Sequence, residues 1–273
     1  MQKLRLGCSA MPLSLHDYKT QFEALANLGF KQIEILSGVR DFPEDLDKRK
    51  RKELLEMSSS YGLNIYSVSP GYSGANLNLI SLNPAVRRIT LKQVKDMVHL
   101  TGDLGGKMFV LCPGMRWVFY TIPFKEAWEI SKRAIIQLGK IAENLGVTLC
   151  IEQLPFGFLE MSEDVRKMAE EINMDSVKVM LDTSNTVMRE PITKAIKTVG
   201  EYLVHMHLSD CDGKNFAHWP IGRANIDFAA VAQALKEVRY NGVCILEVWD
   251  EKGDPAQYLA DSKNRLEKLG WQA

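Results

Sequence analysis

Short apolar runs rich in β-branched residues alternate along this chain with longer segments whose apolar positions recur every three or four residues. The short runs predict strands, and the longer segments predict amphipathic helices. Eight strands are expected, at Leu4–Ser9, Gln32–Leu36, Asn64–Ser69, Met108–Cys112, Thr148–Gln153, Val177–Asp182, Leu203–Ser209 and Val243–Val248. Eight helices are expected, at His16–Leu28, Leu46–Tyr61, Ala85–Leu104, Lys125–Leu145, Ser162–Ile172, Ile192–Val199, Phe228–Val238 and Pro255–Leu269.

This alternation predicts an α/β fold, because a helix between two strands covers one face of a parallel sheet. Eight such units in 273 residues match the (β/α)₈ TIM barrel, which typically needs about 250 residues. A doubly wound open sheet is the alternative, but the turn after the first strand contains no GxGxxG motif. No linker divides the sequence, so we expect one TIM-barrel domain over residues 1–273. Glycines after several predicted helices indicate C-caps: Gly29, Gly62, Gly105, Gly146 and Gly242.

The overall charge narrows the choice of partner. The chain has 34 Lys and Arg against 34 Asp and Glu, which gives no reason to expect nucleic acid or an anionic membrane. No apolar run reaches the roughly 18 residues that a membrane-spanning helix needs. The five cysteines are widely spaced and form no CxxC pair, which favours reduced thiols and a cytoplasmic location.

Ionisable residues stand at the ends of four consecutive predicted strands. The fifth strand stops on Glu152, the sixth on Asp182 and the eighth on Glu247, while the seventh carries His205 and His207. Active sites of barrels lie where the strands end, so polar residues there indicate function. A carboxylate late in a helix-covered strand is costly unless it is paired or bound to a cation. We therefore expect a shared metal site.

The strand period and the donor set refine this expectation. A period of two places His205 and His207 on the interior face, with His207 nearer the open rim, so His207 is the expected ligand and His205 a core histidine. Three carboxylates and one imidazole favour Mn²⁺ or Mg²⁺, with Zn²⁺ or Co²⁺ also possible. Metal-dependent amidohydrolases also carry an HxH pair, but they carry it on the first strand, which disfavours that class.

Several segments carry a resemblance to a known family. They are IEQLP (151–155), LDTSN (181–185), HLSD (207–210), IGRANIDF (221–228) and GVCILEVW (242–249), supported by residues 26–36 and 79–114. The chain resembles the sugar isomerase/epimerase superfamily of xylose isomerase-like TIM barrels. Within it, the resemblance is greatest to ketose 3-epimerases of the tagatose and fructoselysine types and to inosose isomerases.

The resemblance implies a metal held by Glu152, Asp182, His207 and Glu247, with Glu152 and Glu247 also serving as the acid/base pair. One carboxylate takes the proton next to a ketone, giving an enediolate, and the other returns a proton on the opposite face. The expected function is therefore a divalent-metal-dependent epimerase or isomerase of a ketose or keto-polyol in carbohydrate metabolism, with Mn²⁺ as the first choice of cofactor. The family also implies a homo-oligomer, a dimer or a tetramer.

The chain departs from the family pattern at residues that are expected to contact the substrate. Phe158 stands where family members commonly place a second Glu, and Asn185 stands where they often have a His. The identity of the substrate is therefore not carried over. The candidate substrate contacts are Asn185, His218 and Arg223, and a phosphate could meet Lys214 or Arg223. Three aromatic residues are candidates for the pocket wall: Trp117, Phe158 and Trp249.

Other functions remain open at this point. A dehydratase of the inosose or dehydroshikimate type would use the same metal and bases, with His218 as the acid that protonates the leaving hydroxyl. The related endonuclease branch needs a multi-zinc cluster with more histidines, and Asn185 and Ala217 stand where further ligands would be expected. A non-catalytic sugar-binding module would not require the full set of four metal ligands.

Overall fold

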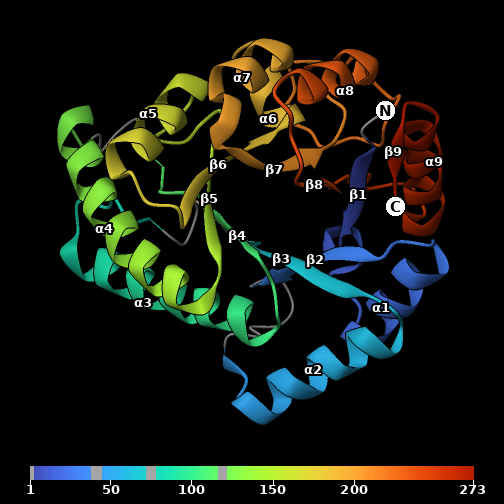
Figure 1. The fold of residues 1–273 in the computed structure, drawn as a ribbon, viewed down its shortest axis with the longest axis horizontal. Helices are drawn as coiled ribbons and strands as arrows, with labels where there is room; N and C mark the ends of the chain where they lie inside the picture. Colours follow the sequence, from blue (N-terminus) through green and yellow to red (C-terminus); the bar gives the residue numbers. More distant parts are fainter. Residues whose placement is uncertain (1–2, 38–44, 72–77, 116–121) are drawn as a thin grey trace.

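The chain forms a closed barrel of eight parallel strands in the computed structural model, which describes residues 3–37, 45–71, 78–115 and 122–273. Consecutive strands are neighbours, and β1 pairs with both β2 and β8, which closes the barrel (Figure 1). The predicted (β/α)₈ TIM barrel is confirmed. The barrel strands are β1 (Leu4–Ser9), β2 (Gln32–Ser37), β3 (Asn64–Pro70), β4 (Met108–Leu111), β5 (Thr148–Glu152), β6 (Val177–Asp182), β7 (Leu203–Leu208) and β8 (Val243–Leu246).

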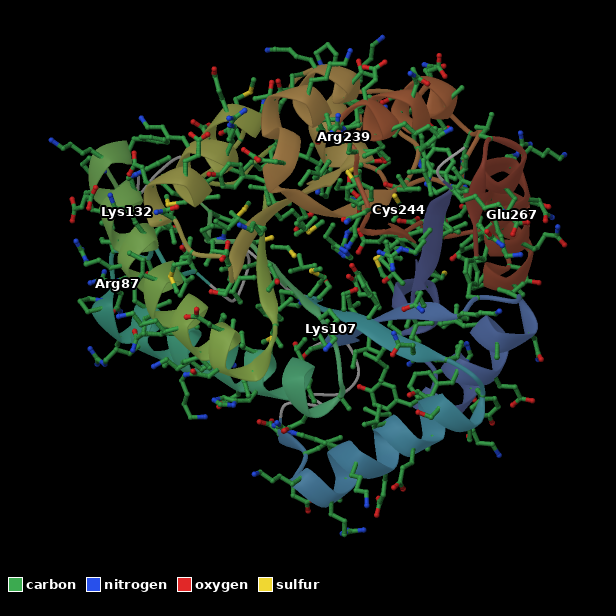
Figure 2. The ribbon with its side chains drawn as sticks, in the orientation of Figure 1. Arg87, Lys107, Lys132, Arg239, Cys244 and Glu267 are labelled. Carbon is green, nitrogen blue, oxygen red and sulfur yellow. The ribbon has the colours of Figure 1, made fainter. Side chains whose placement is uncertain are left out.

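Helices surround the barrel, and charged side chains lie on their outer faces, as Figure 2 shows for Arg87, Lys132 and Glu267. No helix within the described ranges has the length and apolar character needed to cross a membrane. The helices are α1 (Tyr18–Asn27), α2 (Lys48–Ser60), α3 (Pro84–Asp103), α4 (Phe124–Leu145), α5 (Ser162–Ile172), α6 (Thr183–Val187), α7 (Ile192–Val199), α8 (Phe228–Glu237) and α9 (Pro255–Lys268).

A short α-helix and a short strand were not expected from the pattern. The short helix α6 begins directly after β6, where the Asp182 side chain accepts a hydrogen bond from the Asn185 N–H at 2.7 Å and caps the helix. The two-residue strand β9 (Trp271–Gln272) pairs with the start of β1. Both elements are too short to produce a periodic signal.

Two apolar layers position the site. The larger lies between the sheet and the helices and contains most buried apolar residues. Small groups fill the barrel interior, one of which contains Tyr66, Val243 and Ile245. Because side chains alternate along a strand, the interior positions of β8 continue from Val243 and Ile245 to Glu247, just past its end. The interior packing therefore ends in the ionisable residues at the carboxyl face.

One predicted glycine cap is wrong. Gly29, Gly62, Gly105 and Gly146 have positive φ angles, as a C-cap requires, but Gly242 does not. A Cβ at Gly242 would lie 2.2 Å from the Val204 carbonyl oxygen, so glycine is needed there for close approach of the backbone.

Candidate functional site

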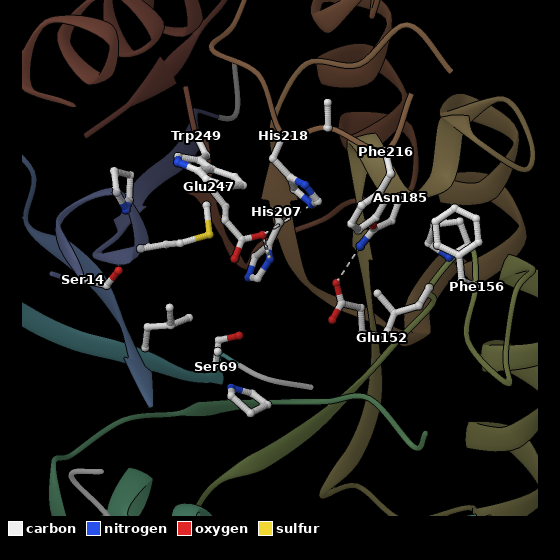
Figure 3. A pocket seen from close by; sticks show the side chains of 18 of the residues that line it. Ser14, Ser69, Glu152, Phe156, Asn185, His207, Phe216, His218, Glu247 and Trp249 are labelled. Atoms are coloured by element: carbon white, nitrogen blue, oxygen red, sulfur yellow. Dashed lines mark hydrogen bonds and ion pairs between the residues drawn. The ribbon is translucent and has the colours of Figure 1, made fainter. Parts of the chain in front are cut away.

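A pocket of about 700 Å³ opens at the carboxyl ends of the strands (Figure 3). Strand ends on several sides contribute to it, among them Ser69 of β3, Glu152 of β5 and His207 of β7. The loops after β7 and β8 add His218 and Glu247. This is the face of a barrel on which active sites form.

Glu152 lies on one side of the pocket, beside Asn185 (Figure 3). Its Oε1 accepts a hydrogen bond from Asn185 Nδ2 at 3.0 Å, and its Oε2 accepts one from the Cys112 thiol at 2.9 Å. Asn185 is itself held at its backbone N–H by Asp182. Asn185 therefore lines the pocket, as expected of a substrate contact, and also connects two carboxylates.

Asp182 and Glu247 converge on a third residue, His218. The His218 Nε2 lies 3.6 Å from Asp182 Oδ1 and 4.0 Å from Glu247 Oε2. Ligand atoms of these three side chains all lie within 4.8 Å of one another, so they could hold a metal ion. The Oδ2 of Asp182 is buried and has no hydrogen-bond partner. An unpaired carboxylate oxygen is costly in a protein interior, and a cation would remove that cost.

His207 lies between two carboxylates. Its Nδ1 is 2.9 Å from Glu247 Oε2, and its Nε2 is 3.1 Å from Glu34 Oε2. Glu34 also accepts from Ser67 at 2.8 Å and lies 3.2 Å from His205 Nε2. His205 is fully buried and does not line the pocket, so its place is in the interior beneath the site, whereas His207 faces the pocket.

The environments of the two glutamates push their pKa values apart. Burial raises the pKa of Glu152 to about 7, helped by the nearby Glu247 and Asp182 charges, although His207 opposes the rise. Burial also acts to raise the pKa of Glu247, but its contacts with His207 and the charge of His218 outweigh it and lower that pKa. Burial likewise raises the pKa of Asp182. Two carboxylates with opposite pKa shifts suit separate acid and base roles.

The loop that carries His218 contains a buried carboxylate, Asp210. Asp210, fully buried, accepts backbone hydrogen bonds from Gly222 at 2.9 Å, Ala224 at 2.8 Å and Ile226 at 3.1 Å. The backbones of Asp210 and Trp219 also exchange two hydrogen bonds. The loop between β7 and α8 is therefore folded around Asp210, a role that its place in the HLSD motif did not reveal.

The remaining predicted residues divide between the pocket and its surroundings. Arg223 does not line the pocket; its guanidinium contacts the Asp250 carboxylate and stacks over the Trp219 ring. Trp249 lines the pocket as a wall, but Phe158 is buried against Phe124 and Trp128 instead. Trp117 lies outside the described residues.

Two aromatic wall residues were missed in the sequence, Phe156 and Phe216. Phe156 lies two positions from Phe158, and the turn between them determines which ring faces the pocket. The Gly157 N–H bonds to the Leu154 carbonyl, and the Phe158 N–H bonds to the Gly114 carbonyl. No periodic pattern in the sequence indicates such a turn.

The fold and this cluster define a TIM barrel with an ionisable site at its carboxyl face. The chain belongs to the xylose isomerase-like TIM barrel family, whose family model matches residues 22–269. It is 30% identical over 251 residues to a D-psicose 3-epimerase of Ruminiclostridium cellulolyticum, covering 87% of this chain and 80% of the relative. It is 24% identical to a fructoselysine 3-epimerase of Escherichia coli, and the match covers 91% of this chain and 92% of that relative.

Solved structures agree on the fold. A D-psicose 3-epimerase of Clostridium cellulolyticum, solved with D-tagatose, superposes with a TM-score of 0.83 at 23% identity, covering 98% of this chain and all of that one. A 3-keto-D-glucoside 4-epimerase of Escherichia coli in its apo form also superposes with a TM-score of 0.83 at 20% identity. The superposition covers 97% of this chain and all of that one. The resemblance to xylose isomerase-like barrels and ketose 3-epimerases is thus confirmed.

Proposed function

We propose that this protein is a divalent-metal-dependent sugar epimerase that acts on a ketose or keto-polyol through an enediolate, with Glu152 and Glu247 as the acid/base pair. One observation carries the proposal above the others. Glu152, His207 and Glu247, from the ends of β5, β7 and β8, line one pocket. Asp182, at the end of β6, lies against the lining residues His218 and Glu247 and keeps a buried oxygen without a hydrogen-bond partner. The expected enzyme class, isomerase, is confirmed by the relatives, whose names are those of sugar epimerases.

The donor chemistry of the site fits a hard or borderline divalent cation. Asp182 and Glu247 lie with His218 in one group whose ligand atoms are close enough to hold it, whereas His207 groups with Glu34 and His205. In our proposal His207 and Glu152 complete the ligand set around the cation, and His218 is a further candidate ligand. The cation would supply Lewis-acid stabilisation of the negative charge that develops on the sugar oxygens when a C–H proton leaves. Mn²⁺ remains our first choice.

The protein's own groups would move the proton. In the metal-free protein burial raises the pKa of Glu152 to about 7, and a carboxyl group whose pKa lies near the working pH can both accept and release a proton in general acid–base catalysis. Glu247 remains ionised beside His207 and His218. Figure 3 shows Glu152 and Glu247 apart from each other, on different sides of the ring of His207. Removal of a proton by one carboxylate and its return by the other would invert the stereocentre between them.

A dehydratase of the inosose or dehydroshikimate type is not favoured. It would use His218 as an acid on a leaving hydroxyl, yet the named relatives are epimerases. The experiment below separates the two reactions by their products.

The test is incubation of the Mn²⁺-loaded protein with D-fructose, D-tagatose and D-psicose in D₂O, followed by NMR. Deuterium at C3 together with the C3 epimer supports the proposal, whereas an aldose product would indicate isomerisation and loss of water a dehydratase. Asp182→Asn should abolish the exchange, and Asp175→Asn, which changes a fully exposed carboxylate, should not. Absence of exchange with all three sugars, and with the benzyl ethers of D-fructose described below, in a folded, Mn²⁺-binding protein would overturn the proposal.

A further inference from the structure

The outer part of the pocket is apolar. Phe156, Phe216 and Trp249 line it while exposing 49%, 55% and 55% of their surface. Leu15 lines it as well and is 80% exposed. Large apolar groups that stay exposed around one opening indicate a surface that a ligand covers.

Cationic groups are missing from this wall, as far as the described residues extend. None of the described lining residues is Lys or Arg. Lys214 and Arg223, the residues considered for a phosphate, do not line the pocket, and Arg223 is committed to Asp250. Among the lining residues that the structure describes, a phosphate on the sugar would therefore meet no Lys or Arg, the partners that phosphate recognition normally uses.

Phe156 and Phe216 form a supported aromatic platform. Their rings lie edge to face, with centroids 5.5 Å apart and planes at 67°. The Arg189 guanidinium lies 5.8 Å from the Phe156 ring centroid and also contacts the Pro155 carbonyl and, at 3.1 Å, the Glu160 carboxylate. Arg189 thus supports the Phe156 ring, and its own charge is already paired.

The platform lies beside the catalytic groups, not at a separate site. Phe216 also contacts His218 edge to face, at 5.4 Å between centroids. In Figure 3 both phenylalanines lie on the side of the pocket where Glu152 and Asn185 meet, and Trp249 lies on the side of Glu247. A sugar bound between the two glutamates would therefore have one end directed at the platform.

The size and polarity of the pocket suit a larger ligand than a free ketose. Pockets of roughly 300–1,000 Å³ take drug-sized ligands, and this one measures about 700 Å³. Outside the ionisable cluster and Asn185, the side chains of the described lining residues offer the hydroxyls of Ser14 and Ser69 and the indole N–H of Trp249 to the many hydroxyls of a sugar. The remainder of the wall is suited to an apolar group.

We propose that the substrate is a ketose or keto-sugar bearing an uncharged apolar substituent, such as an aryl or alkyl group, which packs on Phe156 and Phe216. This inference rests on the proposed epimerase function and specifies its substrate class. The reacting ketone would lie among the ionisable residues, and the substituent would cover the exposed rings.

The test compares a free sugar with its benzyl ethers and its phosphates in the D₂O exchange assay with Mn²⁺. D-Fructose, its 1-O-benzyl and 6-O-benzyl ethers, and its 1- and 6-phosphates are assayed for kcat/KM. We expect one benzyl ether to exceed the parent sugar by about tenfold or more, since contacts in an apolar pocket discriminate by such factors. We expect the phosphates to fall below the parent.

The outcomes separate this inference from the proposed function. If D-fructose exchanges deuterium but neither benzyl ether has a higher kcat/KM than D-fructose, the proposed substrate class is overturned and the epimerase function is not. The same holds if a phosphate has a higher kcat/KM than D-fructose. No exchange with any compound overturns the epimerase function, and the inference with it.

A substitution at Phe156 then tests whether this ring is responsible for the preference for the benzyl ether. Phe156→Ala should lower the ratio of kcat/KM for the preferred benzyl ether to that for D-fructose by about tenfold. Ile89→Ala, which removes an exposed apolar side chain from α3 away from the pocket, should leave the ratio unchanged. An unchanged ratio in Phe156→Ala contradicts the proposal. So does a wild-type dimer that dissociates on this substitution, because a second copy would then cover the platform.

Discussion

Glu34 Oε2 lies 3.1 Å from the Nε2 of His207, although the two residues are 173 positions apart in the sequence. The two His207 nitrogens thus have different partners, since Nδ1 lies against Glu247 at the pocket. Burial acts to raise the pKa of Glu34, but His207 and His205 outweigh it and lower that pKa, so Glu34 is an anion. Burial acts to lower the pKa of His207, but the carboxylates at its two nitrogens outweigh it and raise that pKa well above its usual range. A cation bound at the pocket would replace the proton on Nδ1, while Glu34 holds the proton on Nε2, the usual arrangement behind a metal-binding histidine.

Glu34→Gln should therefore weaken Mn²⁺ binding by about tenfold or more, because the amide holds the Nε2 proton less strongly than a carboxylate does. Isothermal titration calorimetry with Mn²⁺ measures the effect. Glu143→Gln, an exposed change on α4, provides the matched control, and circular dichroism establishes that both variants are folded. A folded Glu34→Gln protein with wild-type Mn²⁺ affinity would contradict this role of Glu34.

The fold and much of the site could be predicted because both depend on local periodicity. A period of two places Glu152 above Cys150 and His207 above His205, so the interior residues of each strand lead directly to the pocket. The contact between Glu34 and His207 could not be predicted in this way. It depends on the closure of β2 and β7 into one barrel and on how far each strand extends along it.

Loop geometry limited the prediction of the pocket wall. Phe158 was expected to face the pocket, but its backbone pairing with Gly114 turns it into the core and leaves Phe156 at the opening. Arg223 was expected to reach the substrate, yet Asp250 is near enough to bind it. Such outcomes depend on tertiary contacts, which no local pattern of residues encodes.

Replacement of either glutamate of the proposed acid/base pair should stop proton exchange. Glu152→Gln and Glu247→Gln each remove a carboxylate that would accept or return the proton, and general acid–base groups contribute about 10²–10⁴-fold to the rate. We expect deuterium incorporation to fall at least about 100-fold in each variant, while some Mn²⁺ binding persists through the remaining ligands. NMR in D₂O and calorimetry measure the two quantities separately. Full exchange in both variants would exclude the acid/base pair.

The raised pKa of Glu152 predicts a pH-dependent cost in the metal-free protein. The folded state holds this proton up to a pH of about 7, whereas the ordinary pKa is 4.5. Folding therefore loses free energy as the pH rises from 4.5 to about 7, and the full loss persists above that range.

Glu152→Gln, which cannot ionise, should consequently be more stable than the wild type at pH 8, by on the order of 3 kcal/mol. The difference should shrink towards pH 4.5. Urea unfolding of both proteins in the presence of a chelator, at several pH values, measures it. A difference that does not change with pH would mean that Glu152 is not destabilised by its burial.

Asp210 should stabilise both the fold and the position of His218. Its two carboxylate oxygens accept four backbone N–H groups, from Cys211, Gly222, Ala224 and Ile226. Asp210→Asn replaces one oxygen with a donor that faces other donors, and hydrogen bonds to charged groups contribute about 1.5–3 kcal/mol each. We expect the free energy of unfolding to fall by on the order of 3 kcal/mol and kcat/KM to fall at least about tenfold, since His218 lies in the same loop.

The matched control for this change is Asp212→Asn, at a partly exposed aspartate of the same loop that accepts hydrogen bonds from the backbone N–H groups of Lys214 and Asn215. Asparagine can make the same turn, so its effect on stability should stay below about 1 kcal/mol. Urea unfolding and the exchange assay are measured on both variants. If Asp210→Asn matched Asp212→Asn in both measurements, the loop that carries His218 would be held by its remaining contacts, and Asp210 would have no positioning role.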